Sequence, residues 1–232
     1  MLLSVLFSLP ATALVVRLAL YTHIAAGSLA LLVGLVPMLG RKGGAGHVRT
    51  GLVYVYAMLV VAASAMALCV LQPLVLRRLF LAGVALLSFY LSLSGWQAAR
   101  RRSAALAVGD VALAVLTTLV GLGMVGVGIR LGAVLFGFFG GLLGFFGGLD
   151  AWHGLRPAAA ATPATWLRRH IIRMGGSYIS AFTAFVVVNL GHWLPAGTPA
   201  WVGLAGWIAP AVVGRFLIVA AVRRYTPRPQ LA

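Results

Sequence analysis

The sequence predicts an all-α fold, a polytopic transmembrane bundle of about seven helices. Hydrophobic residues make up 62% of the chain and charged residues only 9%, which is more apolar mass than one water-soluble core buries. The apolar residues come in long runs, and the arginines gather between these runs. This pattern is typical of a multi-pass membrane protein. We expect a single integral membrane domain over residues 1–232.

Seven segments are long and apolar enough to be membrane spans. A helix needs about 20 apolar residues to cross about 30 Å of hydrocarbon, and such runs appear when the chain is divided at charges, proline and glycine. The predicted spans are 11–39, 51–71, 79–99, 104–129, 131–152, 171–194 and 199–222. The join at Arg130, between the fourth and fifth spans, is the narrowest of the boundaries. A count of six or eight spans is the alternative at this stage.

The first three spans are bounded by charged residues. Residues 1–9 are apolar, but no Lys or Arg precedes them and Pro10 follows. They lack the charged start of a cleavable signal, so we expect them to extend along the membrane interface. Basic residues at 41–42 end the first span, and arginines at 77–78 and 100–102 bound the third.

The fourth and fifth spans carry glycines at helical spacing. Residues 137–148 contain the pattern Gly-Phe-Phe-Gly-Gly twice, seven residues apart. The fourth span holds Gly121, Gly123, Gly126 and Gly128. Small residues let membrane helices approach closely, and lipid supplies no hydrophobic drive for helix association. The glycines therefore predict a close-packed contact between these two spans, with a glycine-lined pore as the functional alternative.

The sixth span contains a polar seam and follows a low-complexity linker. At 100° per residue one helical face collects the seam residues His170, Arg173, Ser177 and Ser180. His192 returns close to this face near the end of the span. We expect the seam to face protein, either as hydroxyl packing between helices or as part of a ligand site. Residues 157–165 before it are predicted to be a flexible cytoplasmic loop.

The basic residues predict the orientation of the chain in the membrane. Twelve of them fall in alternate loops and at the C-terminus, namely Arg41, Lys42, Arg49, Arg100, Arg101, Arg102, Arg156, Arg168, Arg169, Arg223, Arg224 and Arg228. The opposite loops hold Arg77, Arg78 and Arg130. The positive-inside rule then places the N-terminus outside and the C-terminus in the cytoplasm. In a bacterial host this topology corresponds to the inner (cytoplasmic) membrane.

The overall charge excludes several classes of function. The formal net charge of +16 does not indicate a nucleic-acid partner, because the arginines sit at span ends without an extended basic face. Asp110 and Asp150 are the only acidic residues, which excludes chemistry that needs several carboxylates. Cys69 is the only cysteine, so the chain has no internal disulfide and no thiolate metal cage.

Ionisable residues inside the spans need a partner or a function. Each costs about 2.5–3.5 kcal/mol on insertion scales. Asp110 and Arg215 lie at similar predicted depth, about 12 Å from the cytoplasmic ends of the fourth and seventh spans. We therefore expect an ion pair between them, which either holds the helices together or relays protons or substrate.

The five histidines are the main candidates for chemistry. His23 and His192 are predicted near the outer boundary, and His47, His153 and His170 near the cytoplasmic one. Two imidazoles at one depth, with an apolar slot between helices, are what a b-type haem needs. The sequence predicts His23 with His192 as one haem site and His47 with His170 as another. Electrons would then pass to or from a quinone or another redox protein.

Two further interpretations remain open from the residues alone. His47, His153 and His170 form a possible zinc set, with Asp150 as a ligand, a ligand-orienting group or a base, as in a membrane hydrolase. The other interpretation is a non-enzymatic transporter or scaffold whose charges hold helices together. Whether the protein is an enzyme stays open.

Two stretches resemble a known family. The first is His23-x-x-x-Gly27 followed by Arg41-Lys42-Gly43, His47, Gly51 and Tyr54, and the second runs from Arg169-His170 through Ser177-Tyr178-Ile179 to Asn189. Together they resemble bacterial multi-pass membrane proteins described as domains of unknown function. The motifs cover about a third of the chain. The resemblance implies that His23, His47 and His170 belong to a shared site, without naming what it binds.

Overall fold

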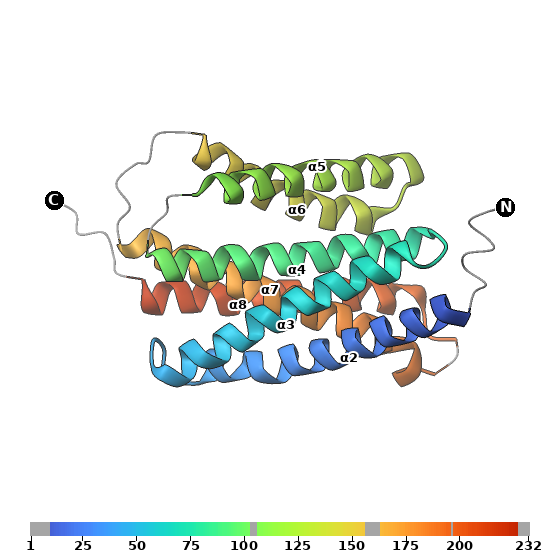
Figure 1. Ribbon diagram of the computed structural model, residues 1–232, viewed down its shortest axis with the longest axis horizontal. Coiled ribbons are helices and arrows are strands. Elements are labelled where there is room, and N and C mark those ends of the chain that lie inside the picture. The colour runs from blue at the N-terminus through green and yellow to red at the C-terminus, as the bar shows by residue number, and fades with distance from the viewer. Residues whose placement is uncertain (1–9, 103–105, 156–162, 196, 227–232) are drawn as a thin grey trace. The chain divides into compact units, whose positions relative to one another are not determined.

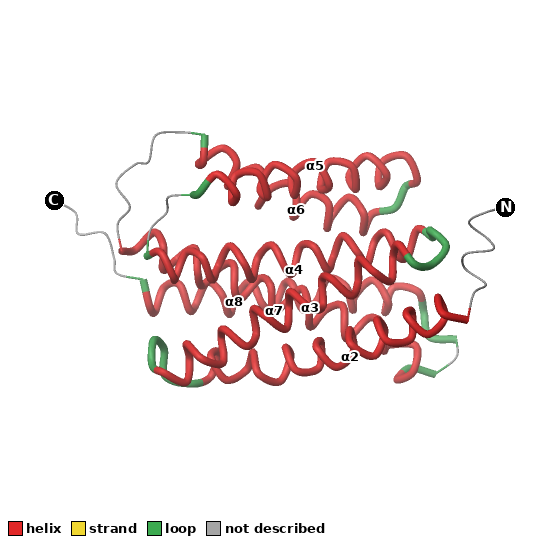
Figure 2. Tube along the Cα trace, in the orientation of Figure 1, coloured by secondary structure: helices red, strands yellow, loops and turns green. Residues whose placement is uncertain are grey.

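The protein is described by a computed structural model over residues 10–102, 106–155, 163–195 and 197–226. These residues form long helices, and no strand occurs among them (Figure 2). The helices are α2 (Pro10–Leu39), α3 (Ala45–Val70), α4 (Leu76–Arg101), α5 (Val108–Leu131), α6 (Val134–Gly154), α7 (Pro163–Trp193) and α8 (Ala200–Tyr225). The predicted all-α fold is confirmed.

All seven helices are long and apolar enough to cross a membrane. The shortest, α6, has 21 residues and the longest, α7, has 31, which is sufficient for a hydrocarbon thickness of about 30 Å. Large apolar side chains such as Leu32, Leu119 and Phe216 are exposed on their surfaces. Because exposed apolar side chains on long helices suit a lipid solvent, the chain is a multi-pass membrane protein.

The chain divides into two compact units, and the first comprises residues 1–89. In this unit α2 and α3 pack side by side as a hairpin (Figure 1). Gly43 lies in the connecting turn at φ +74°, a backbone conformation that favours glycine. The unit also contains the first half of α4. Tyr54 and Met58 on α3 are buried.

The second unit comprises residues 90–232 and holds two more helical hairpins. The second half of α4 belongs to it, and α5 pairs with α6 while α7 pairs with α8 (Figure 1). Gly132, at φ +62°, ends α5 and allows the turn into α6. This unit contains both acidic residues of the chain.

Glycines hold α5 and α6 in close contact, as predicted. A Cβ atom on Gly121 would lie 2.4 Å from the backbone nitrogen of Gly144, and one on Gly128 would lie 2.6 Å from that of Gly137. These distances are too short for any side chain. Gly123, by contrast, has open space around its Cβ position. The close-packed interpretation is confirmed for Gly121 and Gly128, whereas Gly123 and Gly126 lie off the contact.

Several helices extend beyond the predicted spans. α3 begins at Ala45 instead of residue 51, and α7 begins at Pro163 instead of residue 171. The predicted spans are shorter than the helices because the prediction ended each span at a charged residue. A helix can continue through charged residues beyond the hydrocarbon. Arg130 likewise lies inside α5, and the boundary with α6 falls at Gly132.

Some predictions concern residues beyond those described. The interfacial segment 1–9 and residues 157–162 of the predicted loop are outside the described ranges. The end of that loop, from Pro163, belongs to α7. The single-domain organisation stays a prediction.

Candidate functional site

A buried carboxylate forms the centre of a polar cluster in the second unit. Asp150 lies in the last two turns of α6 and is 4% exposed. Its Oδ2 accepts a hydrogen bond from the Tyr90 hydroxyl at 2.5 Å and lies 3.1 Å from Nη2 of Arg169. Its Oδ1 accepts from Nη2 of Arg173 at 2.7 Å. Side chains from α4, α6 and α7 therefore meet at one carboxylate.

Arg173 is held in this cluster by aromatic rings and by a backbone carbonyl. Its guanidinium carbon lies 4.5 Å from the ring centroid of Phe146 and 5.6 Å from that of Tyr90, within the range of cation–π attraction. Nη2 of Arg173 also donates to the carbonyl of Phe146 at 3.3 Å. These contacts hold the guanidinium in position beside Asp150.

The absence of a side chain on Gly95 allows α7 to approach α4. A Cβ atom on Gly95 would lie 2.9 Å from Cβ of Arg173 and 3.1 Å from the backbone nitrogen of Met174. The carbonyl of the same glycine accepts a hydrogen bond from Nδ1 of His170 at 2.9 Å. Gly95 therefore determines how α7 presents Arg173 to Asp150.

The cluster carries more positive charge than its carboxylate neutralises. Arg169 and Arg173 face the single carboxylate of Asp150. Nε of Arg169 and Nη1 of Arg173 are buried and have no hydrogen-bond partner among the residues that the structure describes. Buried donors are normally satisfied, so each of these two nitrogens marks a position where a water or ligand oxygen would be stabilised.

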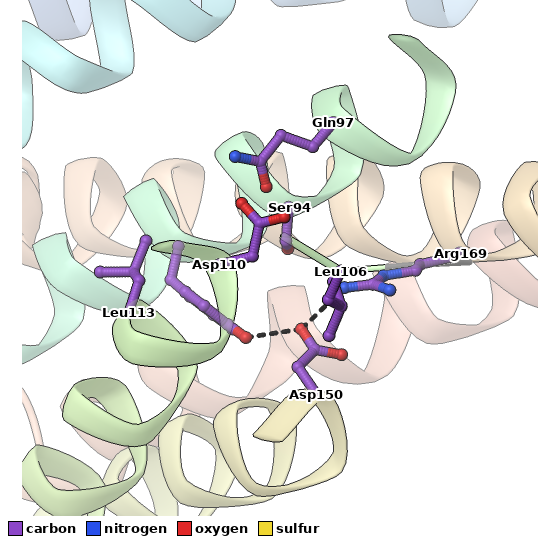
Figure 3. A pocket seen from close by; sticks show the side chains of 8 residues that line it. Ser94, Gln97, Leu106, Asp110, Leu113, Asp150 and Arg169 are labelled. Atoms are coloured by element: carbon purple, nitrogen blue, oxygen red, sulfur yellow. Dashed lines mark hydrogen bonds and ion pairs between the residues drawn. The ribbon is translucent and has the colours of Figure 1, made fainter. Parts of the chain in front are cut away.

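A small polar cavity borders the cluster (Figure 3). It measures about 10 Å³, which is room for the centre of one water molecule. Its lining is Tyr90, Ser94, Gln97, Leu106, Asp110, Leu113, Asp150 and Arg169. The lining therefore combines both carboxylates and Arg169 with hydroxyl and amide groups.

A column of buried polar residues continues from this cluster along α7. Arg173, Ser177, Ser180 and Thr183 are each at most 6% exposed. Their spacing of four, three and three residues keeps them on one helical face over about 15 Å. The predicted seam is therefore confirmed as a face directed into protein. His170, at its start, is only partly buried.

Asp110 pairs with Arg101 and not with Arg215. The Asp110 carboxylate accepts from the Arg101 guanidinium, and it also accepts from the backbone N–H of Ala107 at 2.9 Å. It lies in the first turn of α5, where a negative charge is favoured by the helix dipole. Arg215 is exposed on α8. The predicted Asp110–Arg215 pair is wrong, because the end of α4 supplies a nearer cation.

Three of the four predicted haem ligands bond to backbone carbonyls through Nδ1. His23 bonds to the carbonyl of Val61 at 3.1 Å and to Oγ of Ser64 at 3.0 Å. His47 bonds to the carbonyl of Pro37 at 3.1 Å, and His170 bonds to Gly95 as above. Since a carbonyl only accepts, Nδ1 carries the proton in each ring. His192, the fourth, is exposed in the last turn of α7.

The predicted haem pairs and zinc set each join residues of both units. His23 and His47 belong to the first unit, whereas His170 and His192 belong to the second. The pairs and the zinc set therefore stay predictions. In the second unit, His153 is exposed at the end of α6. Within the described part of the chain, no three His, Cys, Asp or Glu side chains gather as a metal site would require.

The sequence reasoning missed that Tyr90, Arg169 and Arg173 converge on Asp150. Arg169 was counted among the loop charges that set topology, although it lies one turn before Arg173 on α7. The signal that could have found this cluster is the small number of acidic residues. The chain has only two, so each one inside a span needs an arginine on a neighbouring helix as its partner.

Within the described residues, seven long apolar helices define this chain as a multi-pass integral membrane protein. No family model, no curated protein and no solved structure matches it. The family resemblance of the histidine motifs therefore stays a prediction.

Proposed function

We propose that the protein is a membrane transporter whose second unit conducts a polar solute along the buried face of α7. The observation that carries this proposal is the cluster of Asp150, Arg169 and Arg173 within the membrane-spanning helices. A charged residue at the centre of a span costs about 2.5–3.5 kcal/mol on insertion scales, and Arg173 is 4% exposed. One carboxylate leaves one of the two arginine charges unneutralised, and this excess charge favours an anionic ligand over a purely structural ion pair.

The polar column on α7 supplies the rest of the route. Ser177, Ser180 and Thr183 continue inward from Arg173 on the same buried face. Ionisable residues inside a membrane protein that face protein instead of lipid mark solute or ion pathways, and Arg173 at the start of this column is such a residue. By the positive-inside rule, the arginine-rich end of this route faces the cytoplasm, with the N-terminus outside.

Flux measurements in proteoliposomes test this proposal. The probes are radiolabelled acetate, inorganic phosphate and, as an uncharged polar solute, glycerol. We expect at least one of them to cross faster with the wild-type protein than in empty liposomes, and Arg173→Gln and Ser177→Ala to reduce that flux at least fivefold. Arg215→Gln, at an exposed arginine on α8, is the matched control and keeps wild-type flux. Flux no faster than in empty liposomes for all three probes contradicts the proposal.

A second candidate function is b-haem electron transfer by the histidines. Its support is the Nδ1 bonding of His23, His47 and His170 to backbone carbonyls, because histidines that ligate metals usually donate their other ring N–H in this way. The tautomer places the lone pair of each neutral ring on Nε2, the nitrogen that would bind iron. A quinone or another redox protein would be the electron partner.

An absorption spectrum distinguishes this second candidate. Protein purified after expression with added haem precursor would show a Soret band, and His23→Ala or His170→Ala would remove it. His153→Ala, at an exposed position, is the control and leaves the band unchanged. Purified wild-type protein without a Soret band contradicts the haem hypothesis. Elemental analysis of the same sample would detect zinc.

A further inference from the structure

The cluster around Asp150 has the form of a carboxylate-binding site. Three donors from α4 and α7 converge on the Asp150 oxygens, namely the Tyr90 hydroxyl, Nη2 of Arg169 and Nη2 of Arg173. Guanidinium groups bind carboxylates and phosphates through paired N–H donors. In this structure the bound carboxylate belongs to the protein itself.

The donors are more numerous than Asp150 uses. Arg173 is only 4% exposed. Its Nη1 and Nε of Arg169 have no hydrogen-bond partner among the described residues. Both guanidinium groups thus retain a buried N–H donor for a second oxygen. An oxygen atom at either donor would satisfy it, and a negatively charged group would also neutralise the excess charge.

We infer that the transported solute is a small oxyanion, a carboxylate or phosphate, that binds Arg169 and Arg173 in competition with the side chain of Asp150. The inference rests on the proposed transport function and specifies its substrate class. Asp150 acts as a tethered competitor that occupies the arginines when no solute is bound. The cavity of about 10 Å³ is too small for such an anion, so the Asp150 side chain has to turn away when the solute binds.

The arginine-rich end of the second unit provides the entry. The cavity beside Asp150 is bounded toward this end by Asp110, which is bonded to Arg101. Gln97 and Ser94 also line this cavity (Figure 3). Because the Asp110–Arg101 pair is neutral as a whole, the excess positive charge at Arg169 and Arg173 is what attracts an anion from this side.

Binding of inorganic phosphate and acetate to the purified full-length protein tests this inference. Titration calorimetry in detergent, at constant ionic strength set with chloride, should give saturable binding of at least one of them. Arg169→Gln should raise the Kd at least tenfold, and its matched control Arg168→Gln, at the exposed neighbouring arginine, should leave it unchanged. Asp150→Asn should lower the Kd at least tenfold, because it weakens the internal competitor.

The direction of the Asp150 effect separates a tethered competitor from a structural ion pair. A structural pair predicts that Asp150→Asn weakens or abolishes binding. If Asp150→Asn does not fold, the comparison of the Kd values of Arg169→Gln and Arg168→Gln decides the inference. Arg169→Gln is expected to fold, because Arg173 still neutralises Asp150 in that variant. Equal Kd values for these two variants, or no saturable binding by the wild type, overturn it.

A lipid head group carries the same phosphate chemistry. Repeating the titrations in nanodiscs of phosphatidylcholine alone and with phosphatidylglycerol identifies the source. Phosphate binding that phosphatidylglycerol competes away supports the oxyanion site with lipid as an occupant, and binding unaffected by it supports a soluble solute. Glycerol flux in the absence of anion binding overturns the oxyanion class and leaves the transport function standing. Anion binding without flux of any probe overturns the transport function and leaves the oxyanion site standing.

Discussion

Asp110 and Asp150 differ in burial and in the exposure of their ion-pair partners, although both are aspartates. Asp110 lies in the first turn of α5 and is bonded to Arg101, whose side chain is 35% exposed. Asp150 is buried between Arg169 and Arg173, with the Tyr90 hydroxyl on the same oxygen as Arg169. Water screens the first pair, whereas the second retains most of its electrostatic energy.

Asp150→Ala is therefore expected to destabilise the protein strongly. Removing the carboxylate leaves the buried guanidinium of Arg173 and the partly buried one of Arg169 without a counter-charge, a loss of about 3–5 kcal/mol. Thermal unfolding of the detergent-solubilised protein measures it. Asp110→Ala is the comparison and should lose about 1 kcal/mol or less, since its partner is partly exposed. Equal losses for the two variants would contradict the assignment of Asp150 as the buried centre.

Gly95→Ala should displace Arg173 and weaken the cluster. The added methyl group would meet Cβ of Arg173 and the backbone of Met174, neither of which can rotate away. Overpacking of this kind costs about 1–3 kcal/mol. Thermal unfolding again provides the measurement. Gly109→Ala, at a helical glycine with nothing within 4 Å of its Cβ position, is the control and should be neutral or stabilising.

At the scale of elements, glycine spacing decides which helices touch. Gly121 and Gly128 on α5 lie seven residues apart and meet Gly144 and Gly137 on α6. The repeat on α6 has the same period, so the two helices contact each other over two turns. Gly123 lies between the contact positions on another face and contributes nothing to the contact.

Gly121→Ala should separate α5 from α6, whereas Gly123→Ala should not. The new Cβ of Gly121→Ala would lie 2.4 Å from backbone of α6, and backbone cannot move aside as a side-chain tip does. We expect a marked fall in the unfolding midpoint for Gly121→Ala. For Gly123→Ala we expect no fall, because alanine favours a helix over glycine by about 1 kcal/mol. Indistinguishable midpoints would argue against this helix contact.

At the scale of the whole molecule, charge distribution predicts the orientation. The net charge is +16, and its basic residues lie mainly in the loops of alternate helix ends. The positive-inside rule places those ends in the cytoplasm, together with the C-terminus. The structure defines the helices that this rule orients, and the orientation itself stays a prediction.

Cysteine labelling tests the orientation directly. Cys69 is the only cysteine and is buried, so Cys69→Ala gives a suitable background. Thr198→Cys, between α7 and α8, should react with a membrane-impermeant maleimide in intact cells. Arg224→Cys, at the end of α8, should react only after the membrane is opened. The opposite labelling pattern would reverse the predicted orientation.

The sequence by itself determined that the helices lie in lipid and that there are about seven spans. It also determined the glycine contact between α5 and α6 and the face of α7 that is buried. These features depend on apolar length and on the helical period, and both are local properties of the chain. A residue's place within its own helix can be calculated without knowledge of any other helix.

Only the tertiary structure decided which charges meet. Asp150 joins Tyr90, which is 60 residues away, and Arg173, which is 23 residues away. Asp110 bonds to Arg101 at the end of the preceding helix and not to Arg215, which has a similar predicted depth. Depth along each helix specifies one coordinate of a side chain, whereas an ion pair also depends on which helices are neighbours and how each is rotated. Those two properties arise from packing between helices, so no single span contains them.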